Sequence, residues 1–192
     1  MNKSPCFWEI IIYINLIKIF LFLLRNSNLG GNPMLNLNTK EKLLLEDEKS
    51  HEQLCVEKYK DYSSKACDPE LKSLFSDLQQ KEQQHLNTIN QMLQGTVPSM
   101  GSGQSQQNNN QSSNSTSSSP QPSDYSVDDK AHDKMLCQDS LSTEKYVSST
   151  YNTAVFEFRD KNARQVLNHI QKEEQEHGEK IYNYMAQHGM YN

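Results

Sequence analysis

The sequence lacks the residue patterns that mark several common classes of protein. Its four cysteines, in 192 residues, form no Cys-x-x-Cys pair, which argues against a zinc site and provides no disulfide framework. Acidic residues outnumber basic ones by 24 to 19, and the formal net charge is −5. No stretch gathers lysine and arginine into a basic patch, so we expect no nucleic-acid partner.

The N-terminal residues 1–33 hold a long apolar run but lack what a targeting segment needs. Residues 7–24, FWEIIIYINLIKIFLFLL, are long enough for a membrane helix or for the apolar part of a signal peptide. Glu9, Asn15 and Lys18 interrupt this run, and no small-x-small cleavage site follows it. Both targeting interpretations are therefore weak.

A third interpretation is that residues 1–33 are not translated. Reverse translation of Gly30 to Met34 can place a GGAGG ribosome-binding sequence about seven nucleotides before the Met34 codon. We expect translation to begin at Met34, with an apolar membrane anchor and a signal peptide as the alternatives. A membrane partner follows only if residues 1–33 are translated.

The middle of the chain lacks residues that could form a core. Residues 95–127 are rich in serine, glutamine and asparagine and include the run GSGQSQQNNNQSSNSTSSSPQPS. We interpret them as a flexible, disordered linker with no apolar residue to bury. The linker separates residues 34–94 from residues 128–192.

These two segments form an internal repeat with a constant offset of 92 residues and no gap. Apolar, acidic and aromatic positions all coincide under this shift. Examples are the pairs Tyr59 and Tyr151, Asp68 and Asp160, Leu78 and Ile170, and Ile89 and Ile181.

Each repeat is predicted to fold as a pair of helices, because its apolar residues recur every three or four positions. Asp68, followed by Pro69, is the expected N-cap of the second helix. The first helix is expected to begin at Asn38 or Thr39, the third at Ser126 or Asp128, and the second and fourth to end at Gly95 and Gly189. We predict an all-α fold, a four-helix bundle of two repeated helical hairpins joined by a long crossover.

A carboxylate interrupts the apolar stripe of every predicted helix. In the second and fourth helices it belongs to a Glu-x-x-His pair. In the first and third it lies 30 residues before that pair. Because each hairpin turns halfway between the two positions, all these side chains should meet at mid-bundle. They are Glu52, Glu82, His85, Glu144, Glu174 and His177.

One Glu from each of two helices and a Glu-x-x-His from each of the other two is the ligand set of di-iron and di-manganese carboxylate bundles. The i, i+3 spacing puts a carboxylate and an imidazole on one helical face. Four carboxylates and two neutral imidazoles also balance two divalent cations. We therefore predict that these six residues bind two Mn or Fe ions, and we assign no catalytic residue. The alternative is an inherited polar core, in which some carboxyls take up protons.

Other residues near the predicted stripes leave alternatives open. Glu48 shares the face of Glu52 but matches Ser140 in the repeat, so it either supports a ligand or is exposed. Tyr59 and Tyr151 are interpreted as core aromatics, with hydrogen bonding to the ligands as the alternative. We expect His51, His132, His169 and His188 at the surface.

The C-terminal repeat resembles the Coat F family of endospore coat proteins. The resemblance rests on EKYVSSTYNTAVFE, on NARQVLNHIQKEEQEH and on the closing MAQHGMY, where family members often end in Gly-Trp-Tyr and Met190 replaces the tryptophan. It covers residues 128–192 well. Residues 34–94 are similar to the N-terminal hairpin of the same proteins.

The resemblance implies a ferritin-like fold and a structural or assembly role in the spore coat, made in the mother-cell cytoplasm of a spore-forming bacterium. It implies other coat proteins as partners and no enzyme activity, while a homo-oligomer is left open. Cysteines and Tyr182, Tyr184 and Tyr191 are candidates for coat contacts. Manganese catalases and rubrerythrins, as ferritin-like relatives, imply the alternative of a dinuclear oxidoreductase that removes peroxide, or of a metal-storage protein.

Overall fold

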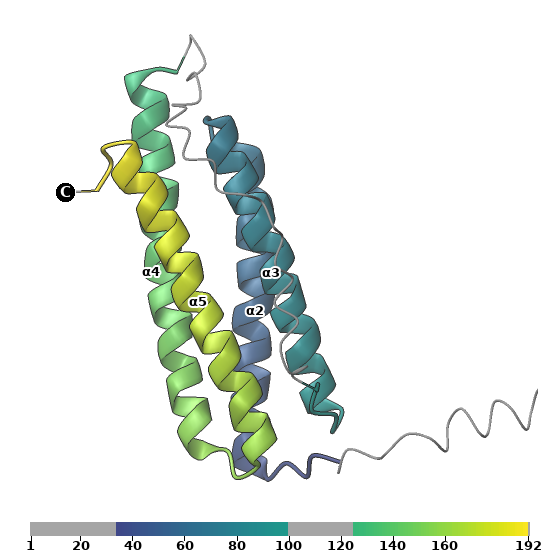
Figure 1. The fold of residues 1–192 in the computed structure, drawn as a ribbon. Helices are drawn as coiled ribbons and strands as arrows, with labels where there is room; N and C mark the ends of the chain where they lie inside the picture. Colours follow the sequence, from purple (N-terminus) through teal and green to yellow (C-terminus); the bar gives the residue numbers. More distant parts are fainter. Residues whose placement is uncertain (1–33, 100–124, 192) are drawn as a thin grey trace, which may run out of the picture. The chain divides into compact units, whose positions relative to one another are not determined.

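The computed structural model describes residues 34–99 and 125–191, which form four helices in two hairpins (Figure 1). Helix α2 packs against α3, and α4 packs against α5, while α2 also contacts α4 and α3 contacts α5. The described residues contain no strand, so the predicted all-α fold of two helical hairpins is confirmed. The helices are α2 (Thr39–Lys65), α3 (Pro69–Leu93), α4 (Val127–Glu157) and α5 (Lys161–Gln187).

Two parts of the predicted domain organisation lie outside the described residues. They are residues 1–33, with their alternative interpretations, and residues 100–124 of the linker. In the described part of the chain, no helix has the length and apolar character needed to cross a membrane.

The described end of the linker is not fully solvated. The chain reverses at Gly95, whose φ is 85°, and Val97 then joins the apolar cluster with an exposure of 9%. The Leu35 backbone N–H donates to the Gly95 carbonyl at 2.8 Å. The expectation that residues 95–127 hold no apolar residue to bury is therefore corrected, because this reversal carries Val97 back into the core.

All four helices begin at a polar side chain that accepts a backbone hydrogen bond from the first turn. For α2 and α4 the earlier of the two predicted positions is the N-cap, and both form a capping box. Each such cap stabilises its helix by about 1 kcal/mol. The caps are Asn38, Asp68, Ser126 and Asp160.

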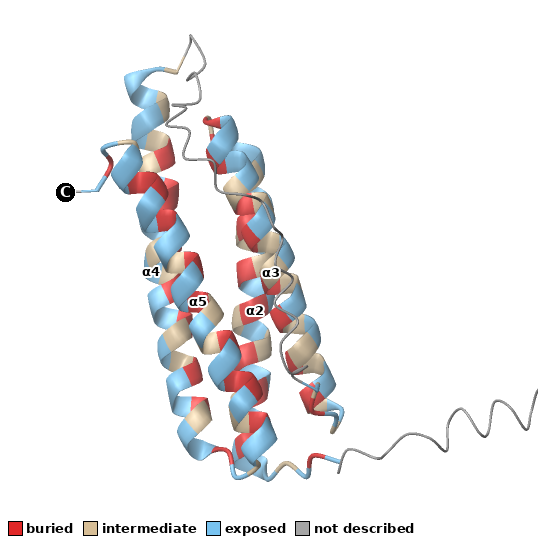
Figure 2. Ribbon diagram, in the orientation of Figure 1, coloured by how far each residue is buried: buried red, intermediate tan, exposed pale blue. Residues whose placement is uncertain are grey.

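The buried face of the helices holds both large apolar side chains and ionisable groups. Figure 2 shows buried residues recurring along all four helices, separated by exposed ones. Buried carboxyl and imidazole groups are costly unless they are paired, protonated or bound to a cation. The largest fully buried side chains are Tyr59, Tyr151, Phe75, Leu45, Leu71, Leu78, Ile89, Met92, Leu167, Ile170, Ile181 and Met185.

Candidate metal centre

The structure brings the six predicted ligands together between the helices. Glu52, Glu82, His85 and Glu174 have donor atoms within 4.8 Å of one another. A second group, in which Glu144 and His177 join Glu82 and Glu174, meets the same limit. All six side chains are at most 3% exposed. The two groups therefore overlap, and they share two carboxylates.

The two hairpins contribute to this centre in a crossed manner. Nδ1 of His85 lies 2.9 Å from Oε1 of Glu174, and Nδ1 of His177 lies 2.9 Å from Oε1 of Glu82. The two imidazole rings stack with their centroids 5.5 Å apart. Each histidine thus meets a carboxylate of the opposite hairpin in addition to the one on its own helix.

Two buried tyrosines hold the remaining carboxylates. The Tyr59 hydroxyl donates to Oε1 of Glu144, and the Tyr151 hydroxyl donates to Oε1 of Glu52. Both tyrosines are fully buried. Tyr59 and Tyr151 were predicted to be core aromatics, with hydrogen bonding to the ligands as the alternative. The structure shows both features at once.

Several buried atoms of the centre have no hydrogen-bond partner among the described residues. Carboxylate oxygens of all four glutamates are in this state, for Glu174 both of them. Oε1 of Glu82 and Oε1 of Glu174 each lie 2.9 Å from a histidine nitrogen, a close ion-pair contact that is not a hydrogen bond. Buried polar atoms are normally paired, since an unpaired one costs about 1–3 kcal/mol. Carboxylate oxygen and imidazole nitrogen are ligands that suit Mn and Fe ions. The atoms are Glu52 Oε2, Glu82 Oε1, Glu144 Oε2, Glu174 Oε1, Glu174 Oε2 and His177 Nδ1.

In the metal-free protein, protons supply the positive charge. Burial, aided by the charge of Glu82, raises the pKa of Glu174 well above its usual value. Burial also raises the pKa of Glu52 to about 7. Burial would raise the pKa of Glu82 as well, but the adjacent imidazoles of His177 and His85 outweigh it and lower that pKa to about 2. The centre therefore combines protonated groups with an ionised one, and a pair of cations could replace the protons.

Glu173 also contacts the candidate metal centre, and no pattern in the sequence pointed to it. Its Oε2 lies 3.0 Å from Nε2 of His85, on the side of the ring opposite the centre, and 3.3 Å from Nε2 of His169. The matching position in the first repeat is Lys81, so the carboxylate has no counterpart there. The two halves of the centre are therefore not equivalent.

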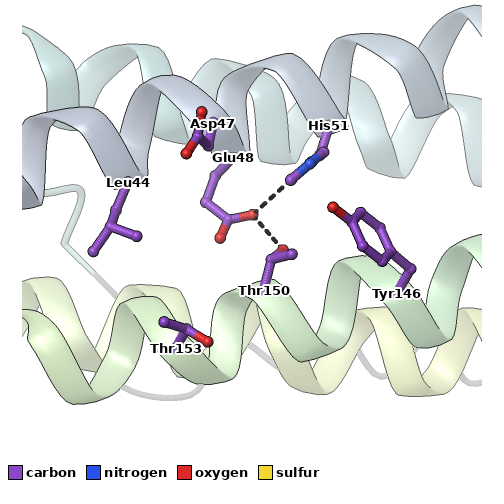
Figure 3. Close-up of a pocket in the computed structure, with 7 residues that line it drawn as sticks. All are labelled: Leu44, Asp47, Glu48, His51, Tyr146, Thr150 and Thr153. Atoms are coloured by element: carbon purple, nitrogen blue, oxygen red, sulfur yellow. Dashed lines mark hydrogen bonds and ion pairs between the residues drawn. The ribbon is translucent and has the colours of Figure 1, made fainter.

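Glu48 is also buried, with an exposure of 1%, so it is not the exposed charge considered as one alternative. Thr150 Oγ1 donates to its Oε2 at 2.9 Å, and Nδ1 of His51 lies 3.4 Å from the same oxygen. Burial raises the pKa of Glu48 to about 8. These residues line an open pocket between α2 and α4 with a volume of about 360 Å³. Figure 3 shows the residues that line it.

Two further buried carboxylates fix contacts between the hairpins. Asp133 on α4 accepts from the backbone N–H groups of Cys67 and Asp68 at 2.8 and 2.9 Å. Glu41 on α2 accepts from the backbone N–H of Arg159 at 2.9 Å and pairs with its guanidinium at 3.1 Å. Both carboxylates are thus committed to structural hydrogen bonds.

One predicted contact residue is corrected. Tyr184 is only 4% exposed, and its hydroxyl donates to Oδ2 of Asp68 at 2.9 Å, because its position on α5 faces the α2–α3 turn. Tyr182 and Tyr191 are 44% and 45% exposed and contact each other edge to face. Only these two of the three tyrosines are accessible to a partner.

Comparison with known proteins bears on the second hairpin. Residues 132–192 match the family model of the Coat F domain, a segment that spans most of α4 and all of α5. No curated protein and no solved structure matches the chain. Half of the candidate ligands, Glu144, Glu174 and His177, lie in the matched segment. Residues 132–192 therefore form a Coat F domain, and this match supports a location in the spore coat.

Proposed function

We propose that this spore coat protein is a structural component of the coat whose bundle holds a pair of manganese or iron ions. The Coat F domain supports the coat role. The metal pair is supported chiefly by one observation, the convergence of six buried ligands with unpaired donor atoms. Other coat proteins, and further copies of this chain, are the proposed partners.

The ligands divide naturally between two ions. Glu52 and His85 would hold one ion, Glu144 and His177 the other, and Glu82 and Glu174 would be shared by both. The four carboxylates neutralise two divalent cations. Because each helix supplies at least one ligand, the ions would link all four helices and stabilise the folded bundle.

A catalytic or storage role is the second candidate. It is favoured by the mixed carboxylate and imidazole donor set, which binds redox-active metals as well as structural ones. Two bound Mn or Fe ions would supply redox chemistry toward peroxide by changing oxidation state. The chain's own residues would hold the ions, and Tyr59 and Tyr151 would orient Glu144 and Glu52.

Metal content of the purified full-length chain, expressed with Mn and Fe supplied, tests the proposal. We expect about two equivalents per chain by mass spectrometry, as the ligand set implies. The double variant Glu82→Gln, Glu174→Gln should bind almost none, because both shared carboxylates lose their charge. The matched control is Asp77→Ala, Glu176→Ala, which removes exposed acids from the same two helices. A parent protein without metal would refute the metal pair.

The same proteins separate the two candidate roles. If the role is structural, the double variant should still fold, as judged by circular dichroism, and be incorporated into the coat, with less heat resistance of the isolated protein. If the role is enzymatic, the loaded parent should remove peroxide and the double variant should not. Peroxide removal by the parent alone would favour the second candidate.

A further inference from the structure

The open pocket between α2 and α4 lies one helical turn from the candidate metal centre. Its buried acid, Glu48, precedes the ligand Glu52 by four residues on α2, a separation of about 6 Å along the helix. Thr150 in the pocket wall directly precedes Tyr151, whose hydroxyl donates to Glu52. Helices α2 and α4 therefore contribute neighbouring residues to the pocket and to the candidate metal centre.

One oxygen of the Glu48 carboxyl group is unpaired at the pocket. Its Oε2 takes both contacts, with Thr150 and His51. Its Oε1 takes part in none of the hydrogen bonds or ion pairs formed by residues 34–99 and 125–191. Figure 3 shows this second oxygen pointing away from His51, toward the space between Leu44 and Thr153. A buried acid with one unpaired oxygen at the wall of a pocket is suited to exchange its proton for a cation.

The rest of the lining has the same chemistry. Asp47 brings a second carboxylate, His51 an imidazole, and Thr150, Thr153 and Tyr146 bring hydroxyl groups. Neither lysine nor arginine is among the residues that line the pocket. The lining therefore favours a cation over an anion, and its oxygen and nitrogen donors suit a hard divalent ion.

The size of the pocket fits a hydrated ion. Six waters around a divalent cation occupy roughly 180 Å³, at about 30 Å³ for each water. The pocket volume of about 360 Å³ accommodates this hydrated ion, while the interior of the centre is closed by buried side chains. An ion would have to lose water between the two places.

The second hairpin has no acid at the position equivalent to Glu48. The position that matches Glu48 under the 92-residue offset is Ser140, which is fully buried and uncharged. Its hydroxyl has no hydrogen-bond partner among the described residues. The acidic pocket therefore serves the centre from the Glu52 side.

We propose that this pocket is a loading site, where a hydrated divalent cation binds Glu48 before it passes to Glu52 in the metal centre. The inference rests on the proposed metal pair and adds the route by which the ions arrive. Glu48 replaces water on the ion, and the unpaired Oε2 of Glu52 is the next available ligand. The ion moves without any change in its oxidation state.

Metal uptake kinetics test the loading site. Full-length protein freed of metal is mixed with Mn²⁺, and the loss of the free-ion electron paramagnetic resonance signal is followed with time. We expect Glu48→Gln to load at least tenfold more slowly than the parent but to reach the same two equivalents. The exposed acid Glu57, also on α2, supplies the matched control Glu57→Gln, which should load at the parental rate.

A second variant keeps the test decisive if Glu48→Gln does not fold. Thr153 lines the pocket but is exposed, so Thr153→Trp can fill the pocket without disturbing the core, and it should also slow loading. Parental loading rates in both variants would overturn the loading site while leaving the metal pair intact. Loss of bound metal at equilibrium in Glu48→Gln would overturn it too, since Glu48 would then belong to the centre. A parent that binds no Mn²⁺ would refute the metal pair and the loading site together.

Discussion

The two histidines of the centre differ in the support that each receives. Nε2 of His85 is paired with Glu173 at 3.0 Å, which leaves Nδ1 directed toward Glu174 in the centre. A carboxylate on the outer nitrogen of a ligating histidine fixes the ring and raises its basicity. Lys81 occupies the matching place in the first repeat, so His177 receives no such carboxylate from it.

Glu173→Ala should therefore weaken the binding of one ion more than the binding of the other. We expect a loss of about 10–100-fold in affinity at the ion that His85 binds and little change at the second ion. Titration calorimetry of the metal-free full-length protein with Mn²⁺ measures both affinities. Glu173→Gln keeps an acceptor for the outer nitrogen and should restore most of the loss, whereas Glu176→Ala, an exposed change on α5, should have no effect. Equal weakening of both ions would contradict this role.

For single residues, the sequence predicted which side chains lie in the core but not which residues of the other hairpin they contact. Glu82 and His85 could be placed in the core because their spacing follows one face of one helix. Glu173 lies beside that stripe, and its importance depends on a residue 88 positions away in the other hairpin. Periodicity within a helix contains no information on such a contact. The hydrogen bonds of Tyr59 with Glu144 and of Tyr151 with Glu52 also join the two hairpins, so the sequence pattern could not predict them either.

The ends of helices were predictable at the scale of the element, because each is fixed by neighbours in sequence. Helices α3 and α5 end in the same way, with Gly95 and Gly189 at φ of 85° and 60°. After α5, the Met190 N–H donates to the Met185 carbonyl at 2.7 Å, the bond expected of a Schellman motif. Met190 itself is buried at 1% exposure, so it fills an apolar position.

Alanine at the two glycines of the α5 region should have opposite effects. At Gly189 an added Cβ would make an ordinary contact with Lys130 Nζ at 3.8 Å, but the positive φ should cost about 1–2 kcal/mol. At Gly178, inside α5, an added Cβ would make an ordinary contact at 3.5 Å with Leu141 Cδ1. There Gly178→Ala should gain up to about 1 kcal/mol from helix propensity. Urea unfolding of the metal-free variants measures both, and effects of equal sign would contradict the argument.

At the scale of the whole molecule, ionisable groups add contacts between the hairpins that apolar patterning does not predict. The 3.6-residue periodicity predicted four helices and their buried faces. It could not identify Asp133, which accepts from the Asp68 N–H, or Arg159, which pairs with Glu41 across 118 residues. These pairs depend on which helices become neighbours, and this is a property of the assembled bundle.

The same buried groups make the stability of the metal-free bundle depend on pH. Burial raises the pKa of Glu52 to about 7 and that of Glu48 to about 8. Burial would lower the pKa of His177, but the nearby carboxylates of Glu144 and Glu82 raise it to about 9. All three groups keep protons in the folded chain at pH values where the unfolded chain has released them. The free energy of unfolding should therefore fall as pH rises from about 5 to 9.

Metal binding should oppose this fall, because the ligands bind a cation only after they release their protons. In a chelator, the free energy of unfolding of the parent should be lower at pH 8.5 than at pH 6, by about 1.4 kcal/mol per pH unit for each proton involved. Its melting temperature should be lower at pH 8.5 for the same reason. Mn²⁺ at about 100 times its dissociation constant adds about 2.7 kcal/mol for each site. At one fixed Mn²⁺ concentration the gain should be larger at pH 8.5, because the deprotonated ligands bind the ion more tightly. Differential scanning calorimetry at both pH values measures this, with Glu82→Gln, Glu174→Gln as the variant that should not respond to metal. A chelated parent that grows more stable with rising pH would show that the buried centre does not hold the protons inferred here, and the exchange of protons for metal would then be wrong.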